Sequence, residues 1–361
     1  MTPATTEKPA SPALRDHFLH LTPGKLMGLR QITDKNHKFK VFALDQSNSF
    51  KKALRAAAEK AGAPKEPTYE DIRDAKLVMV KELAPLASAC LLDVNFGARQ
   101  AVNSFALPNG VGLIVRSEAS KDPGIPSEYE PGWSVEKIKK MGASAVKLLI
   151  YMDVEDKTFT KAQIDFATKM ARECERFDIL LMTEELSFPR KGEEKSSPEY
   201  QARKIRNIME STKLIGPITD ILKLEFPGDI KNDSTQKMQD NLGKLNEAAT
   251  RPWVLLSAGE KFDLFTKQVD LAMKAGCGGY MAGRAIFNEW FEQPKGAAQD
   301  KFLKTTGIER MNTLNKIVDQ HAQPWTARFG LDAKQMLGAV DPHWYNGGKS
   351  AGGKGAVEGA Y

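Results

Sequence analysis

Two lysines interrupt apolar runs that are otherwise typical of buried strands. Lys223 lies within DILKLE (220–225), and Lys147 lies within AVKLLIY (145–151). Both burial and a neighbouring positive charge lower the pKa of an amine, and an amine with a lowered pKa attacks carbonyl carbons to form a Schiff base. A structural ion pair of Lys223 with Glu184 or Glu225 agrees equally well with this spacing.

Carboxylates follow two further apolar runs. VFAL (41–44) is followed by Asp45 and Gln46, and DILLMTE (178–184) ends in Glu184. A carboxylate beside a reactive amine can carry protons during carbon–carbon cleavage. We assign this role to Glu184 and not to Glu185, because side chains alternate between the two faces of a strand. The alternative for either residue is a solvent-exposed charge or a helix N-terminal charge.

Glycine-containing turns end the last two runs. WVLLSAG (253–259) ends in Ser257, Ala258 and Gly259, and GGYMAG (278–283) ends in Gly283, which Arg284 follows. Backbone N–H groups at such turns bind phosphate, and an arginine can add a bidentate contact. We predict a phosphate site here, with simple tight turns and a surface arginine as the alternative.

Eight short apolar runs would position these residues. Most of them are near-continuous apolar segments, as expected for parallel strands that helices cover on one side, and helical patterns lie between many of them. The runs are 41–44, 89–93, 111–115, 145–151, 178–184, 220–225, 253–259 and 278–283. Eight α/β units, with no GxGxxG or Walker loop after the first run, predict a (β/α)8 TIM barrel, and an open doubly wound sheet is the alternative. Active sites of such barrels lie at the C-terminal strand ends, where the polar residues gather.

Composition favours a single domain, and its net positive charge is compatible with a small anionic substrate. The chain has 361 residues and a formal net charge of +6, and its basic residues are scattered, so we expect neither a nucleic acid nor a membrane as partner. We expect a flexible N-terminal arm (1–20), one barrel domain (21–335) and a flexible Gly-rich tail (336–361). Oligomeric state is not determined by the sequence, and a homo-oligomer stays open.

Cysteines and histidines bear on compartment and cofactor. Cys90, Cys174 and Cys277 form no CxxC pair, which predicts buried free thiols and a cytoplasmic location. A zinc site needs several imidazole ligands on the barrel strands. The histidines all lie outside the second to eighth predicted strands. They are His17, His20, His37, His321 and His343. We therefore expect no metal and no other cofactor.

From about residue 40 to 330 the chain resembles the tagatose 1,6-bisphosphate aldolase family of class I aldolases. The segments that carry the resemblance are FALDQ (42–46), LLD (91–93), AVKLLIYMD (145–153), EELSF (184–188), DILKLEFP (220–227), LSAG (256–259), AGRAIF (282–287) and TTG (305–307). The resemblance implies a Schiff base on Lys223 and acid/base chemistry by Glu184. It implies that Lys147 and Asp45, with Gln46 beside them, line the substrate. It also implies a phosphate clamp at the two glycine turns, and dihydroxyacetone phosphate and glyceraldehyde 3-phosphate as products.

The sequence departs from the family pattern at one position that bears on the substrate. The family commonly has DQRG where this chain has DQSN, so Ser47 stands in place of an arginine directed at the far end of the substrate. The loop 188–200 is similar to a related branch that cleaves 6-deoxy-6-sulfofructose 1-phosphate. Arg190, Lys191 or Lys51 could supply the missing charge. A sulfosugar aldolase or transaldolase, and a non-enzymatic sugar-phosphate-binding regulator, are the alternative functions.

Overall fold

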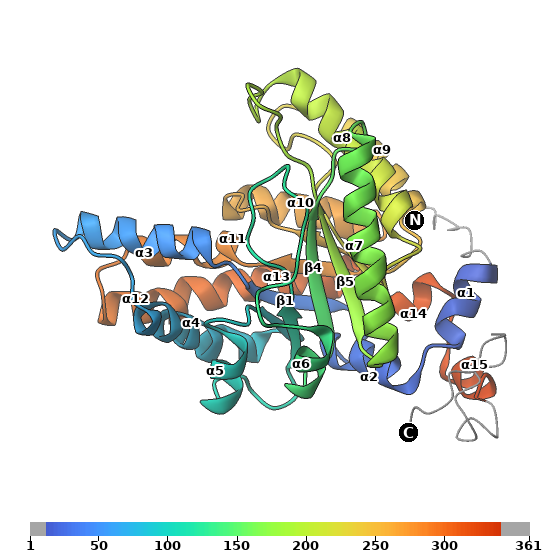
Figure 1. Cartoon of the computed structure of the whole chain (residues 1–361), viewed down its shortest axis with the longest axis horizontal. Helices are drawn as coiled ribbons and strands as arrows, with labels where there is room; N and C mark the ends of the chain where they lie inside the picture. Colours follow the sequence, from blue (N-terminus) through green and yellow to red (C-terminus); the bar gives the residue numbers. More distant parts are fainter. Residues whose placement is uncertain (1–11, 341–361) are drawn as a thin grey trace.

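Eight parallel strands close into a barrel, in agreement with the predicted fold. The computed structural model describes residues 12–340, and each strand pairs with the next in sequence until β8 pairs with β1 (Figure 1). The strands are β1 (Phe39–Leu44), β2 (Ala89–Leu92), β3 (Gly112–Arg116), β4 (Ala145–Tyr151), β5 (Leu180–Leu186), β6 (Ile221–Leu224), β7 (Trp253–Leu256) and β8 (Gly279–Ala282). All eight predicted runs overlap a strand.

Helices cover the outside of the barrel between the strands. They are α3 (Asn48–Lys60), α4 (Tyr69–Leu83), α5 (Ala98–Asn103), α6 (Val135–Lys140), α7 (Lys157–Arg176), α8 (Pro198–Ile215), α9 (Thr235–Ala248), α10 (Phe262–Lys274), α11 (Arg284–Phe287), α12 (Ala297–Phe302) and α13 (Ile308–His321). Several begin after a serine, threonine or aspartate whose side chain accepts a hydrogen bond from the first turn, as Ser197 does at α8 and Ser234 at α9. Such caps satisfy amide groups that the helix itself leaves unpaired.

Alternation along each strand separates two layers of buried side chains. On β6, Leu222 and Leu224 pack in the layer between strands and helices, whereas Ile221 points into the barrel. The interior layer is apolar at the N-terminal end of the barrel, where Val41, Ile221 and Val254 lie. The interior thus changes from apolar to charged along the strands, which confines the polar residues to one end.

Short helices close the apolar end of the barrel. They are α1 (Pro12–Leu19), α2 (Pro23–Ile32), α14 (Trp325–Arg328) and α15 (Ala333–Gly338). Phe18 of α1 is fully buried, and its ring stacks on Phe329 at a centroid distance of 4.1 Å. Residues 12–19 of the expected flexible arm are therefore helical and packed, because Phe18 anchors them. The expected Gly-rich tail begins within α15, and residues 1–11 and 341–361 lie outside the described residues.

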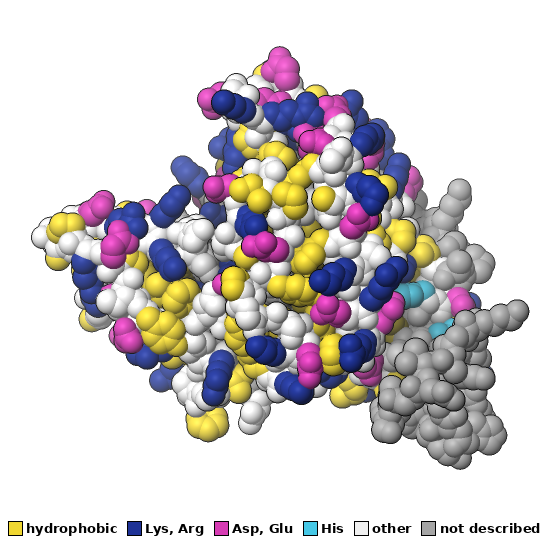
Figure 2. All heavy atoms as spheres, viewed as in Figure 1, with side chains coloured by type: hydrophobic (Ala, Val, Ile, Leu, Met, Phe, Trp, Pro, Cys, Tyr) yellow, Lys and Arg dark blue, Asp and Glu magenta, His cyan; other side chains and the backbone are white. Residues whose placement is uncertain are grey.

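Surface charge and cysteine placement follow the composition. On the face shown in Figure 2, lysine and arginine side chains are interspersed with acidic ones. Cys90, Cys174 and Cys277 are free and buried, as predicted. Within residues 12–340, no helix is long and apolar enough to cross a membrane.

Candidate active site

The C-terminal strand ends surround a cavity of about 590 Å³. Lys147 of β4, Glu184 of β5 and Lys223 of β6 line it, and all three side chains are buried. Glu184 and Lys223 are direct partners in the β5–β6 register. The Glu184 Oε2 atom lies 2.8 Å from Lys223 Nζ and also 2.8 Å from Lys147 Nζ. One carboxylate oxygen therefore bridges the two ammonium groups.

Lys147 is surrounded by three carboxylates. Its Nζ lies 3.0 Å from Asp45 Oδ2 and 2.9 Å from Glu118 Oε1, in addition to Glu184. Burial disfavours the charge, but the three carboxylates outweigh it and raise the pKa of Lys147 above its ordinary value. The expectation that burial and repulsion lower the pKa of both interior lysines is therefore wrong for Lys147.

The same charges act on the carboxylates. Burial alone would raise the pKa of Glu184, but Lys147 and Lys223 lower it below its ordinary value. The pKa of Asp45 is likewise lowered, since Lys147 and more distant cations outweigh the effect of burial. Glu118 differs, because burial dominates and raises its pKa. Its Oε2 atom also lacks a hydrogen-bond partner among the described residues.

Lys223 has a simpler environment than Lys147. Among the described residues, Glu184 is the one carboxylate within 4.0 Å of its Nζ atom. The ion pair proposed as the structural alternative is therefore present, but it lies on the cavity wall and not in a sealed core. A lysine in this position can meet a ligand that enters the cavity.

The two glycine turns meet at one side of the cavity. Ala258 and Gly259 both have positive φ angles, 49° and 77°, a conformation that is uncommon for a residue other than glycine. A Cβ atom at Gly259 would lie 2.9 Å from the Arg284 guanidinium carbon, so Arg284 lies directly across this turn. The predicted phosphate-binding residues Ser257, Ala258, Gly259, Gly283 and Arg284 all line the cavity.

Gly283 is required where the last turn approaches the first strand. A Cβ atom there would lie 2.2 Å from the Ala43 carbonyl oxygen and 3.0 Å from the Gln46 side-chain nitrogen. Gln46 also lines the cavity, and its Oε1 atom is buried without a hydrogen-bond partner among the described residues. The close approach joins the predicted phosphate turns to the segment that carries Asp45.

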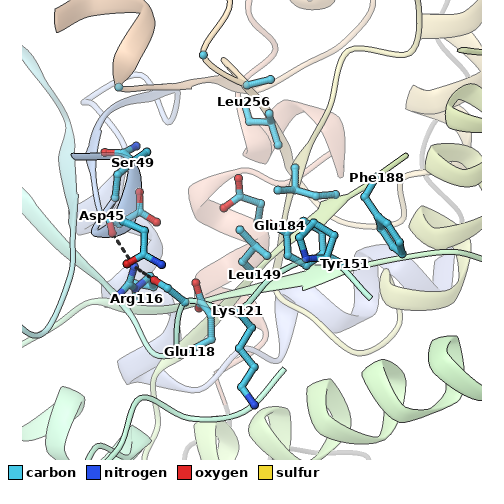
Figure 3. A pocket seen from close by; sticks show the side chains of 18 of the residues that line it. Asp45, Ser49, Arg116, Glu118, Lys121, Leu149, Tyr151, Glu184, Phe188 and Leu256 are labelled. Atoms are coloured by element: carbon cyan, nitrogen blue, oxygen red, sulfur yellow. Dashed lines mark hydrogen bonds between the residues drawn. The ribbon is translucent and has the colours of Figure 1, made fainter. Parts of the chain in front are cut away.

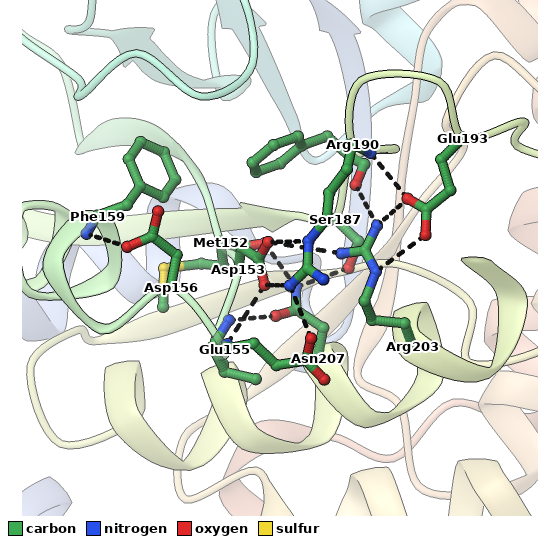
Figure 4. A network of polar contacts seen from close by, with 12 residues as sticks. Met152, Asp153, Glu155, Asp156, Phe159, Ser187, Arg190, Glu193, Arg203 and Asn207 are labelled. Atoms are coloured by element: carbon green, nitrogen blue, oxygen red, sulfur yellow. Dashed lines mark hydrogen bonds and ion pairs between the residues drawn. The ribbon is translucent and has the colours of Figure 1, made fainter. Parts of the chain in front are cut away.

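The three cations predicted for the far anion do not line this cavity. The Arg190 guanidinium makes two 2.8 Å contacts with the Asp153 carboxylate and one of 2.7 Å with Glu155 (Figure 4). Lys191 lines a separate surface hollow beside Arg190, and Lys51 Nζ lies 5.0 Å from the centre of the Phe96 ring. Their positive charges are therefore directed elsewhere. The cavity is lined instead by Lys52, Arg116, Lys121 and Lys195.

Sequence reasoning missed Arg116 and Glu118. Arg116 comes directly after the run 111–115, and Glu118 lies two residues further along. Both therefore share the interior face of Ile114 and line the cavity at the end of β3. Figure 3 shows Asp45, Arg116 and Glu118 on one wall of the cavity, with Tyr151 and Phe188 on the opposite side. The rule that polar residues gather at strand ends would have identified them if it had been applied to the third run.

A buried lysine outside the cavity supports its wall. Lys76 of α4 is fully buried, forms an ion pair with Asp93, and donates 2.9 Å hydrogen bonds to the carbonyl oxygens of Leu44 and Gln46. These contacts hold the chain on both sides of Asp45. The sequence signal was a lysine on the apolar face of a helix.

Glu225, which had no predicted role, anchors the loop after β5. Its Oε2 atom accepts a 2.7 Å hydrogen bond from the Ser187 backbone N–H. The Ser187 hydroxyl oxygen in turn accepts one of 2.9 Å from Asn207 of α8 (Figure 4). Burial raises the pKa of Glu225. This chain of contacts positions Phe188, which lines the cavity.

Within the described residues, no group of three or more histidine, cysteine, aspartate or glutamate side chains has the arrangement of a metal site. The side chains that converge in the cavity are lysines, arginines and carboxylates. This set suits the binding of an anionic substrate and the movement of protons.

The fold is a (β/α)8 barrel whose cavity gathers lysines, arginines and carboxylates, and sequence comparison gives its family. The profile of DeoC/LacD family aldolases matches residues 40–289, so the chain belongs to this family of aldolases.

Two bacterial relatives named as tagatose 1,6-diphosphate aldolases are consistent with this family membership. The chain is 29% identical over 332 residues to tagatose 1,6-diphosphate aldolase 2 of Streptococcus agalactiae serotype III (strain NEM316), covering 85% of this chain and 99% of the relative. It is 28% identical over 330 residues to tagatose 1,6-diphosphate aldolase of Lactococcus lactis subsp. lactis, covering 85% and 98%.

Solved structures share the fold. A fructose-bisphosphate aldolase from Plasmodium falciparum superposes with a TM-score of 0.61 at 13% identity, covering 88% of this chain and 98% of the other. A Schiff-base-forming fructose-1,6-bisphosphate aldolase superposes with a TM-score of 0.53 at 18% identity, covering 81% and 99%. At these identities the likeness supports the fold alone.

Proposed function

We propose that this aldolase cleaves a ketose 1-phosphate, with tagatose 1,6-bisphosphate as the leading substrate, through a Schiff base on Lys223. The observation that carries the proposal is the Glu184 oxygen held 2.8 Å from both Lys223 Nζ and Lys147 Nζ. It puts a candidate nucleophile, a candidate proton carrier and a fixed cation within one cavity. The tagatose-aldolase relatives support the choice of substrate.

The reaction begins with an attack by the neutral Lys223 amine on the C2 carbonyl of the substrate. One nitrogen proton moves to the carbinolamine oxygen, and Glu184 gives that oxygen the proton it took from the Lys223 ammonium group. The oxygen then leaves as water, and a protonated imine remains on Lys223. The imine withdraws electrons from the adjacent carbons, which is the task that zinc performs in metal-dependent aldolases. No metal or organic cofactor is needed for this mechanism.

Glu184 then carries protons during cleavage. Its carboxylate takes the proton of the C4 hydroxyl as the C3–C4 bond breaks, and the bonding electron pair forms an enamine with the imine. The aldehyde departs, Glu184 returns the proton to C3, and water releases dihydroxyacetone phosphate from Lys223. The lowered pKa of Glu184 keeps it ionised and able to accept the first proton.

Fixed charges orient the substrate around this pair. Lys147 stays protonated because of its three carboxylates and contacts substrate oxygens, while Asp45 accepts hydrogen bonds from hydroxyl groups. The turn at Ser257–Gly259 and the Gly283–Arg284 turn bind the 1-phosphate through backbone N–H groups and the guanidinium.

A product assay with purified protein tests the proposal. Tagatose 1,6-bisphosphate, fructose 1,6-bisphosphate and 6-deoxy-6-sulfofructose 1-phosphate are supplied separately, and dihydroxyacetone phosphate is measured after dialysis against EDTA. We expect release from tagatose 1,6-bisphosphate at an undiminished rate after dialysis. Faster release from the sulfonated sugar would favour the sulfosugar alternative, and binding of all three without release would favour a regulator.

A further inference from the structure

We propose that the far end of the substrate carries a tetrahedral oxyanion, and that this anion binds between Arg116 and the N-terminus of α3. The inference rests on the proposed function and extends it to the end of the substrate opposite the 1-phosphate. It also explains how the far end of the substrate can be bound although Ser47 stands in place of an arginine. Arg116, at the end of β3, brings its guanidinium to Ser47.

Arg116 is a buried cation without a close carboxylate partner. Its Nη1 atom donates to the Asp45 carbonyl oxygen at 2.9 Å, and its Nη2 atom donates to Ser47 Oγ at 3.2 Å. The one carboxylate within 4.0 Å among the described residues is that of Glu130, at 3.7 Å. Only 5% of the Arg116 surface is exposed, and its Nε atom has no hydrogen-bond partner among the described residues. A buried charge in this state is stabilised by binding an anion.

The first turn of α3 supplies a second group of donors on the same wall. Ser47 occupies the N-cap position of this 13-residue helix, but its side chain accepts no hydrogen bond from the helix. It accepts from Arg116 instead. The N–H groups of a first turn have no partner within the helix and favour anions. Asn48 and Ser49 line the cavity, and Figure 3 shows Ser49 on the wall that carries Arg116.

The other cations at the cavity fit this role less well. Lys121 is paired with Glu128 at 2.8 Å, and its side chain points away from the cavity in Figure 3. Lys52 and Lys195 are exposed to solvent, where a single charge contributes little binding energy. Arg116 is the buried arginine of this wall, and its planar guanidinium matches the geometry of phosphate.

The test compares one ketose with and without its far anion. The discrimination ratio is kcat/KM for tagatose 1,6-bisphosphate divided by kcat/KM for tagatose 1-phosphate. We expect Arg116→Met to lower this ratio about 30-fold or more, because a buried charge pair loses one partner. The matched control Lys195→Met, at an exposed cation of the same cavity, should change it less than about threefold. The sulfonated analogue, assayed in parallel, distinguishes a sulfonate from a phosphate at the far end.

A double variant separates anion binding from structural support. Arg116→Met combined with Ser47→Arg moves the guanidinium to position 47 and should recover a large part of the lost ratio. Arg116→Lys should give an intermediate value. An equal loss for both substrates in Arg116→Met, or an equal drop of the ratio in Lys195→Met, would overturn the proposal.

Two further measurements keep this test distinct from that of the proposed function. Dihydroxyacetone phosphate has no far anion, so borohydride trapping with it reports the Lys223 chemistry independently of Arg116. Wild-type protein without an adduct contradicts the proposed function. Calorimetric binding of the two tagatose phosphates to wild type and Arg116→Met still tests the anion site in that case. Equal affinity losses there would contradict it.

Discussion

The strands β4 and β6 each place one buried lysine beside the same glutamate, yet the two lysines have different surroundings. Lys147 on β4 contacts Asp45, Glu118 and Glu184, whereas Lys223 on β6 contacts Glu184. Three carboxylates raise the pKa of Lys147 and keep its proton in place. The surroundings of Lys147 show that burial alone does not lower the pKa of a lysine, because paired carboxylates can outweigh the effect of burial.

The comparison assigns separate tasks to the two lysines. Lys147 is a fixed cation that holds three acidic side chains at one wall of the cavity. Lys223 shares with Lys147 the one carboxylate that lies within 4.0 Å of its Nζ atom among the described residues, and it is the amine that we propose forms the Schiff base.

The largest effect is expected from removing the amine of Lys223. Lys223→Met should lower kcat/KM for tagatose 1,6-bisphosphate by about 10⁴-fold or more, since the covalent step is lost. The measurement is the rate of dihydroxyacetone phosphate release. Lys121→Met, which removes a rim lysine, is the control and should retain activity within about threefold. A Lys223→Met variant with near wild-type rates would give the nucleophilic role to another group.

Removing the shared carboxylate should have the second largest effect. Glu184→Gln keeps the shape but cannot accept a proton, so kcat should fall by about 10² to 10⁴-fold. The matched control is Glu185→Gln, one residue along on the outer face of β5, where we expect a change below about threefold. Equal losses in both variants would show that β5 itself, and not the Glu184 proton, limits the rate.

Removing the fixed cation should reduce both activity and stability. Lys147→Met removes the cation shared by Asp45, Glu118 and Glu184, of which Glu184 keeps Lys223 as a second partner. This costs about 3–5 kcal/mol of unfolding free energy at pH 8. The deficit should shrink toward pH 5, because the repelling carboxylates then take up protons in the folded state. Urea unfolding at both pH values measures it. Lys147→Arg keeps the charge and should recover much of the stability, and a pH-independent deficit would contradict the account.

The smallest effect concerns Glu185, a buried carboxyl group that has no cation within 4.0 Å among residues 12–340. Burial raises the pKa of Glu185 from 4.5 to about 8. The folded state therefore binds this proton more tightly than the unfolded state, and its stabilising effect is lost as the pH rises from 4.5 to 8. Between pH 5 and 8, wild type should lose up to about 4 kcal/mol of unfolding free energy relative to Glu185→Gln.

Urea unfolding of the two proteins at several pH values tests this prediction. The control is Glu210→Gln, at an exposed position on helix α8, which packs against β5. The pH profile of this variant should follow that of the wild type. Parallel pH profiles of wild type and Glu185→Gln would show that Glu185 is not a buried neutral acid. A confirmed difference would sharpen the contrast with Glu184, which two lysines keep ionised.

Much of the fold could be predicted because strand periodicity is local. The apolar runs around Lys147 and Lys223 coincide with β4 and β6, since parallel strands buried on both faces need continuous apolar segments. Lys223 and Glu184 could be placed on the same face by alternation alone. Residues 12–19 were expected to be flexible. Their packing could not be foreseen, because the contact of Phe18 with Phe329 joins segments more than 300 positions apart.

Placement of long side chains could not be predicted in the same way. Arg190 was expected near the substrate, but its guanidinium turns to Asp153, a residue of another loop. Arg116 was missed because the third run was taken to end at residue 115, one position before the strand does. The partners of a flexible charged side chain depend on which loops meet in space, and sequence spacing does not report that.

Borohydride trapping tests the central claim, that Lys223 and not Lys147 forms the Schiff base. Purified protein is incubated with dihydroxyacetone phosphate, reduced with borohydride and digested, and the modified peptide is identified by mass spectrometry. We predict a reduced adduct on Lys223 in wild type and in Lys121→Met, and none in Lys223→Met. An adduct on Lys147, or an unmodified Lys223 in protein that still cleaves substrate, would contradict the account.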